Sequence, residues 1–311
     1  MKLMVKLSVS VPTVTSMVCG RLSDTKRIRG SITLELLTAR TLIHKTYSSA
    51  EPRIMIPLIK YDKVAVAQTA YQMVCAMVYA RRSFVLGLAA GESQLLLYKE
   101  MVDGFKRKEL DFDCIQAFIL DEFLGFAPDH PKSFYTFIRK HLFQYVNIRT
   151  KNIHYLDGSS KNIQLHSMNY EQQIQQCGGI DLQILGIGRN DHSGFNEPGS
   201  AMSSRTGVIT LLPETLANNR GYFGGAKAVS LYAIAMGVGT MLEAKHIMLL
   251  ATGSQKAEAV AAMVEGPLTS MCPASALQIH PHVTIICDEE AAVGLKHKEM
   301  YAWVLQNQYN T

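Results

Sequence analysis

Short apolar runs alternate with amphipathic stretches along the chain from about residue 53 onward. The runs have the length of buried strands, and they occupy Phe84–Leu88, Cys114–Leu120, Leu182–Gly188, His246–Ala251 and Val283–Cys287. Apolar positions at helical spacing predict a helix over residues 62–82. Further helices are expected over residues 95–106, 161–177 (a polar helix) and 257–264, and another opens near Ser133. Residues 54–59 contain Pro57 and are predicted to form an edge strand.

This alternation predicts the fold class. Strands that alternate with helices favour an α/β protein with a doubly wound, mostly parallel, Rossmann-like sheet flanked by helices. We expect one such domain over residues 53–311. In these sheets, ligands bind in the crevice beyond the carboxyl ends of the strands.

Four of the predicted strands end in polar residues. The ends read Gly91-Glu92-Ser93, Asp121-Glu122, Asn190 to Glu197, and Ser254-Gln255-Lys256. Because the topology brings such ends to one edge of the sheet, we expect these groups to converge on a single site.

Two of these ends suggest proton transfer. Asp121 follows an apolar strand, and its carboxylate could act as a general base if it is partly desolvated; a helix cap or a solvated loop acid is the alternative. His192 follows Gly186 and Gly188, and Glu197 could orient its imidazole. The alternative for His192 is a hydrogen-bonded residue of a polar loop.

Lys256 suggests a phosphate site. It follows Gly253-Ser254-Gln255 near the start of a predicted helix, where backbone N–H groups and an ammonium group suit an anion. A surface lysine at a helix start is the alternative. Arg220 is a second candidate cation. Together with the base and the histidine, these cations favour proton-transfer chemistry on a phosphorylated sugar.

Charge and composition set the N-terminal segment apart. The chain of 311 residues is 48% hydrophobic and has a net charge of +5. Residues 1–50 hold eight Lys/Arg against two Asp/Glu, a balance of +6, so the rest, at −1, is nearly neutral. The basic balance is therefore no indication of nucleic-acid binding. We interpret residues 1–52 as a basic, poorly ordered extension, with an organellar transit peptide as the alternative.

Several functional classes find no support in the sequence. The six scattered cysteines form no C-x-x-C pair, and several lie in apolar runs, which favours buried free thiols in a reducing, cytoplasmic compartment. No apolar run of about 18 residues predicts a membrane span. No G-x-G-x-x-G follows the first strand and no metal-ligand spacing occurs, so we expect neither a cofactor nor a metal.

The chain from about Arg53 to Trp303 resembles the glucosamine-6-phosphate deaminase (isomerase) family. The resemblance is carried by short stretches across the chain: Phe84–Leu88, Tyr98-Lys99, Asp121-Glu122-Phe123, His130-Pro131, Ser133-Phe134-Tyr135, Gly186-Ile187-Gly188, Phe195-Asn196-Glu197-Pro198, Ser204-Arg205-Thr206, Gly237–Thr240 and Gly253–Ala257. The Phe-Asn-Glu-Pro segment is specific, since the related 6-phosphogluconolactonases share the fold but lack it.

The resemblance implies residue roles and an activity. His192 would open the sugar ring, supported by Glu197 and Asn190, and Asp121 would move a proton from C2 to C1. Lys256, Arg220 and the segment Gly91, Glu92 and Ser93 would hold the phosphate. The implied enzyme is a hydrolase that converts the amino-sugar phosphate glucosamine 6-phosphate to fructose 6-phosphate and ammonia. Members of the family are often homo-oligomers.

The sequence departs from the family pattern at three places. The phosphate loop, usually Gly-Gly-Thr/Ser-Pro, reads Gly91-Glu92-Ser93-Gln94. The residues around His192 are Asp191 and Ser193 instead of Gly and Ile. Gly207, Val208 and Ile209 replace the basic residues of an allosteric site. These departures leave two alternatives: a catalytically weak sugar-phosphate-binding relative, or an enzyme of the same fold acting on another phosphosugar or a lactone.

Overall fold

The computed structural model describes residues 55–81, 83–189, 194–223 and 230–307. The predicted extension over residues 1–52 lies outside these ranges, so its boundary stays a prediction. Within the described ranges, no helix is long and apolar enough to cross a membrane.

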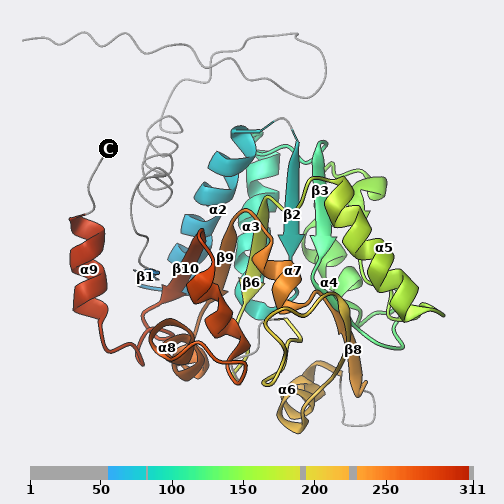
Figure 1. Ribbon diagram of the computed structural model, residues 1–311. Helices are drawn as coiled ribbons and strands as arrows, with labels where there is room; N and C mark the ends of the chain where they lie inside the picture. Colours follow the sequence, from blue (N-terminus) through green and yellow to red (C-terminus); the bar gives the residue numbers. More distant parts are fainter. Residues whose placement is uncertain (1–54, 82, 190–193, 224–229, 308–311) are drawn as a thin grey trace, which may run out of the picture.

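A seven-stranded parallel sheet forms the centre of the domain (Figure 1). Its strands, in spatial order, are β1 (Pro57–Lys60), β10 (Val283–Asp288), β9 (Ile247–Ala251), β6 (Leu182–Gly186), β2 (Phe84–Leu88), β3 (Ile115–Ile119) and β5 (Ile153–His154). Strands β2 and β9 are buried along their whole length. A parallel sheet covered on both faces requires such continuous apolar strands.

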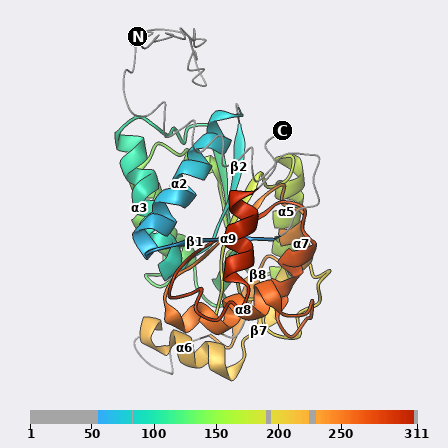
Figure 2. The same ribbon diagram turned by 90° about the vertical axis from the view of Figure 1, so that its left-hand side faces the viewer.

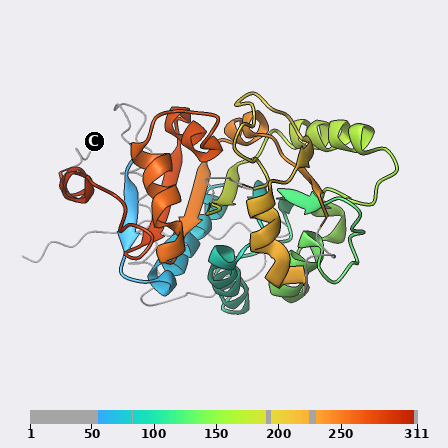
Figure 3. The same ribbon diagram turned by 90° about the horizontal axis from the view of Figure 1, so that it is seen from below.

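Helices cover both faces of this sheet, as Figures 2 and 3 show. One face packs against α2 (Lys63–Tyr79), α3 (Glu92–Lys106) and α4 (Phe134–His141); the other packs against α5 (Ile163–Gln176), α7 (Val238–Leu242) and α8 (Ala257–Glu265). One large hydrophobic cluster lies on each face of this sheet, and a third, smaller cluster contains Phe123 and Phe195. The helix α9 (Lys298–Gln306) lies beside the β1 edge, outside these layers.

The predicted doubly wound α/β fold is confirmed, and most predicted elements are found with shifted ends. Strand β2 has the predicted bounds, and Pro57 opens the edge strand β1, where its missing N–H is tolerated. Helix α3 begins at Glu92, three residues before the predicted Leu95, because Gly91 serves as its N-cap.

A second sheet was not predicted. It is antiparallel and consists of β4 (Asp121–Phe123), β8 (Tyr232–Ala235) and β7 (Gly207–Thr210). Residues Asp121 to Phe123 were expected only as the polar end of the preceding strand. Instead, Leu120 bridges the two sheets: its N–H donates to Leu88 O and its carbonyl accepts from Met236 N, both at 2.9 Å. These strands are too short to produce a periodic sequence pattern.

The cysteines agree only in part with the expectation of free thiols. Cys75, Cys177, Cys272 and Cys287 are free. The expectation is wrong for Cys114, which is disulfide-bonded. Cys114 stands just before β3 and is only partly buried, so it lacks the enclosure of an apolar strand.

Asp181 joins three segments beside the start of β6. Its carboxylate accepts hydrogen bonds from Val85 N and Lys245 Nζ, both at 2.8 Å, and from the guanidinium of Arg81. The side chain of Asp181 is 5% exposed. A buried carboxylate with three donors fixes the start of β2 relative to β6.

We expect Asp181→Ala to lower the free energy of unfolding by about 1–3 kcal/mol, because it leaves the buried Val85 N–H without an acceptor. Urea denaturation measures the change. Asp103→Ala is the matched control, since Asp103 pairs with exposed Lys99 on the surface of α3, and such pairs contribute little. Equal effects of the two substitutions would contradict the assigned role of Asp181.

Candidate active site

A cavity of ≈ 360 Å³ lies where the four polar strand ends meet. It is lined by residues that follow β2, β3, β6 and β9, among them Ser93, Asp121, Gly188 and Lys256. The predicted convergence is therefore confirmed for the ends after β2, β3 and β9, whereas only Gly194 and Phe195 of the segment from Asn190 to Glu197 are among the described lining residues. A cavity of this kind at the carboxyl edge of a parallel sheet is the usual place for a ligand.

Asp121 is the buried acid of the cavity. It is 4% exposed, and its Oδ1 has no hydrogen-bond partner among the described residues. Burial raises the pKa of the carboxyl from 3.8 to about 7, against the lowering effect of the N–H that Phe195 donates to it. A carboxylate with a pKa near neutrality and one open oxygen suits a group that takes up and returns a proton.

Gly194 allows the chain to pass close to Asp121. Its φ is +59°, and a Cβ there would lie 2.9 Å from Leu120 Cδ2 and 3.2 Å from Asp121 Oδ2. Only glycine takes this conformation at such close range without strain. The close approach lets the next residue, Phe195, donate its N–H to the carboxylate.

Lys256 follows strand β9 and lines the same cavity as Asp121. Its Nζ donates to Ile187 O at 2.7 Å. Burial lowers the pKa of Lys256, Arg189 lowers it further, and Glu92 raises it. Two cations and one carboxylate thus act on the same part of the cavity. Arg189 was not singled out from the sequence, although its place directly after Gly186-Ile187-Gly188 could have indicated it.

The start of α3 supplies backbone donors to the cavity. Gly91 is its N-cap, and the next residue, Glu92, lines the cavity with an exposed side chain. Ser93 Oγ lies 3.3 Å from Thr252 Oγ1, which joins this helix start to the end of β9. A helix N-terminus beside a lysine favours an anion.

Gly253 and Asp288 hold the turn before Lys256. Gly253 has a φ of +89°, and its N–H lies 3.0 Å from both carboxylate oxygens of Asp288. Asp288 ends β10 and also accepts from Ala291 N at 2.8 Å. The lysine therefore follows a turn that is anchored to the neighbouring strand.

A family model described as glucosamine-6-phosphate isomerases/6-phosphogluconolactonase matches residues 63–286. The chain belongs to this family. A glucosamine-6-phosphate deaminase of Hahella chejuensis is 44% identical over 240 residues, which are 77% of this chain and 92% of the relative. Glucosamine-6-phosphate deaminase 2 of Bacillus subtilis is 45% identical over 221 residues, 70% of this chain and 89% of the relative.

Solved structures of the glucosamine-6-phosphate isomerase/6-phosphogluconolactonase family have the same fold. A monomeric glucosamine-6-phosphate deaminase superposes with a TM-score of 0.76 at 34% identity, over 77% of this chain and 100% of that one. A 6-phosphogluconolactonase from Trypanosoma cruzi superposes with a TM-score of 0.64 at 18% identity, over 78% of this chain and 97% of that one. The second likeness bears on the fold alone.

Some of the predicted catalytic residues lie outside the part of the chain that the structure describes, and one lies away from the cavity. Asn190 and His192 lie outside the described residues, as does Asp191, so their roles stay predictions. Glu197 is 3% exposed and does not line the cavity. Its Oε1 accepts from Leu212 N at 3.0 Å, just before α6 (Pro213–Phe223).

Arg220, the second predicted cation, lies on α6 with its side chain exposed. Its neighbours Asn218 and Asn219 line the cavity, whereas Arg220 is not among the described lining residues. Its part in phosphate binding stays a prediction. The described residues contain no cluster of His, Cys, Asp and Glu that could hold a metal ion.

Glu122 has a structural role that the sequence did not indicate. It is 2% exposed, and its Oε2 accepts from Phe134 N at 2.8 Å and from Tyr135 N at 3.4 Å. Burial raises the pKa of Glu122 to about 8. The contact fixes the start of α4. Phe134, at this start, lines the cavity, and its ring stacks on that of Phe195 with the ring centroids 5.5 Å apart.

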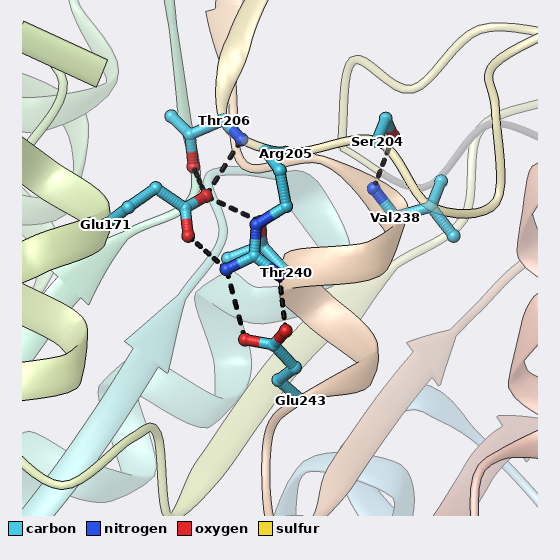
Figure 4. A network of polar contacts seen from close by, with 7 residues as sticks. All are labelled: Glu171, Ser204, Arg205, Thr206, Val238, Thr240 and Glu243. Atoms are coloured by element: carbon cyan, nitrogen blue, oxygen red, sulfur yellow. Dashed lines mark hydrogen bonds and ion pairs between the residues drawn. The ribbon is translucent and has the colours of Figure 1, made fainter. Parts of the chain in front are cut away.

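An ion-pair network joins the segment that precedes β7 to helices α5 and α7 (Figure 4). Arg205 pairs with Glu171 of α5 and with Glu243 after α7. The hydroxyls of Thr206 and Thr240 both donate to Glu171 Oε1 at 2.6 Å. The network therefore fastens the segment before β7 to two helices of the main layer.

We expect Asp121→Asn to stabilise the folded protein at neutral and alkaline pH. Since burial raises the pKa of the carboxyl to about 7, its stabilising contribution is complete below pH 4 and is lost as the pH rises through 7. The variant has no carboxyl at this position and avoids this loss. Its free energy of unfolding relative to that of the wild type should therefore rise between pH 4 and 7, by as much as about 4 kcal/mol. Urea denaturation across this range measures it. A difference that does not change with pH would contradict the raised pKa.

Proposed function

We propose that this chain converts glucosamine 6-phosphate to fructose 6-phosphate and ammonia. The single observation that carries the proposal is the buried carboxylate of Asp121, which shares one cavity with Lys256. The relatives named glucosamine-6-phosphate deaminase, 40–46% identical, support the choice of substrate.

The proposed reaction begins with ring opening. In our proposal His192 moves the proton between the C1 hydroxyl and the ring oxygen, with Glu197 and Asn190 as its support. The product of this step is an open-chain aldehyde with an amino group at C2.

Asp121 then carries the isomerisation. Its carboxylate removes the proton from C2 while the aldehyde oxygen gains one, which forms an enolamine between C1 and C2. Return of the proton to C1 leaves an iminium at C2. Water adds to this carbon and ammonia leaves, so the ketone forms and the net reaction is hydrolytic. A pKa near 7 suits a carboxyl that must take up and give back the same proton.

The phosphate is proposed to lie at the Lys256 end. Support comes from the half-buried ammonium, from Arg189, and from the start of α3 with Gly91 and Ser93. Glu92 also lines this end of the cavity, and in the proposal its exposed carboxylate stays hydrated, which keeps its repulsion of a bound phosphate small.

Glu92 also favours a second candidate, a sugar-phosphate-binding protein with little turnover. Its carboxylate acts on Lys256 and would repel a phosphate bound there. A rise in melting temperature with glucosamine 6-phosphate but no release of ammonia would support this candidate. Turnover of a lactone but not of the amino sugar would instead favour another substrate.

The compartment and the assembly remain parts of the proposal. We propose the cytoplasm, because four cysteines form no disulfide, although the disulfide of Cys114 argues against a reducing compartment. The expected homo-oligomer stays a prediction, and a solved glucosamine-6-phosphate deaminase at 34% identity is monomeric. Sedimentation of the purified protein would decide between them.

We expect purified protein to release ammonia from glucosamine 6-phosphate, and Asp121→Asn to lower kcat by about 100- to 10,000-fold, as is usual when a general base is lost. A coupled ammonia assay measures this. Asp103→Asn, on the surface of α3, is the matched control and should have no effect. Equal turnover by Asp121→Asn and the wild type would exclude the assigned base.

We expect Lys256→Met to raise KM by roughly 10- to 100-fold, because a hydrogen bond to the charged phosphate is lost. Steady-state kinetics measures the change, with Lys99→Met as the control, since Lys99 pairs with Asp103 on the surface. An unchanged KM would place the phosphate elsewhere.

A further inference from the structure

Gln94 is a buried polar residue whose function the site has not explained. It is the third residue of α3, it is 2% exposed, and it lines the cavity. Its side-chain Nε2 is buried without a hydrogen-bond partner within the part of the chain that the structure describes. An unpaired buried amide destabilises a fold, so its presence in a cavity wall points to a ligand that completes it.

Two glycines make room for this side chain. A Cβ on Gly91 would lie 2.6 Å from Gln94 Oε1, and a Cβ on Gly186 would lie 2.8 Å from Gln94 Nε2. The amide therefore occupies the space between the carboxyl ends of β2 and β6. A larger residue at either glycine would push it out of this place.

The amide nitrogen lies beside the cationic end of the cavity. Gly186, which it approaches, immediately precedes Ile187, whose carbonyl accepts from Lys256 Nζ at 2.7 Å. Ser93, the residue before Gln94, contacts Thr252 at the end of β9. A neutral N–H donor is thus placed among groups that favour an anion.

We infer that Gln94 is a further substrate-binding residue, whose side-chain amide donates a hydrogen bond to a phosphate oxygen of the substrate. The inference rests on the proposed function for the identity of the phosphate. Glu92, two residues before Gln94, also lines the cavity, and its carboxylate acts on Lys256. The extra donor offsets part of the repulsion that this carboxylate brings.

Inorganic phosphate is the probe that tests the inference apart from turnover. We expect Gln94→Met, which keeps the length but not the donor, to raise the Kd for phosphate roughly 10-fold or more in titration calorimetry. Gln94→Glu keeps the shape and adds a charge, so it should weaken binding further. The two variants change the side chain in different ways, so a defect in the folding of one does not remove the test.

Gln183 provides the matched control. It is a second buried glutamine, fully enclosed in β6 and not among the residues that line the cavity. Its Nε2 donates to Ile184 O at 3.0 Å, so its amide nitrogen is paired, whereas its Oε1 has no partner among the described residues. Gln183→Met should leave the Kd unchanged and lower the melting temperature. Gln94→Met should keep or raise the melting temperature, because it removes an unpaired donor.

Three results would overturn the inference. The first is a Kd for phosphate that Gln94→Met leaves unchanged, and the second is a wild-type protein that binds no phosphate. The third is a Gln94→Met variant that loses affinity for glucosamine 6-phosphate but not for phosphate, which would assign the amide to a sugar hydroxyl. Absence of ammonia release would contradict the proposed function but not the phosphate contact, so the two failures can be told apart.

Discussion

The two backbone hydrogen bonds of Leu120 are the constraint on which the site depends. Its N–H donates to the carbonyl of Leu88 at the end of a strand of the parallel sheet, and its carbonyl accepts from the N–H of Met236, which follows a strand of the antiparallel sheet. The next residue, Asp121, must therefore lie in the angle between the sheets, where both exclude water. Its raised pKa follows from this position, since burial is the main cause of the shift.

The site combines groups that are unfavourable for stability with a fold that holds them in place. Asp121 and Glu122 are buried carboxyls with raised pKa values, and Gln94 has an unpaired amide. Apolar clusters on both faces of the main sheet offset these costs, and buried polar anchors such as Asp288 fix the turns around the cavity. Groups of this kind concentrate at functional sites because a ligand or a reaction uses them.

The sequence predicted the parallel sheet because buried strands and amphipathic helices have distinct patterns, and it predicted the site because polar residues at strand ends must converge. It did not predict the second sheet, whose strands of three and four residues show no periodicity. Arg189, Glu122 and Gln94 were also missed as contributors, because their contacts depend on packing between distant segments. The pairing of His192 with Glu197 stays a prediction.

The most direct test of the account is a crystal structure with 2-amino-2-deoxyglucitol 6-phosphate, an open-chain analogue whose C1 alcohol cannot react. The account predicts a phosphate within hydrogen-bond distance of Lys256 Nζ and C2 of the sugar facing the carboxylate of Asp121. An analogue bound in the reverse direction, or outside this cavity, would contradict it.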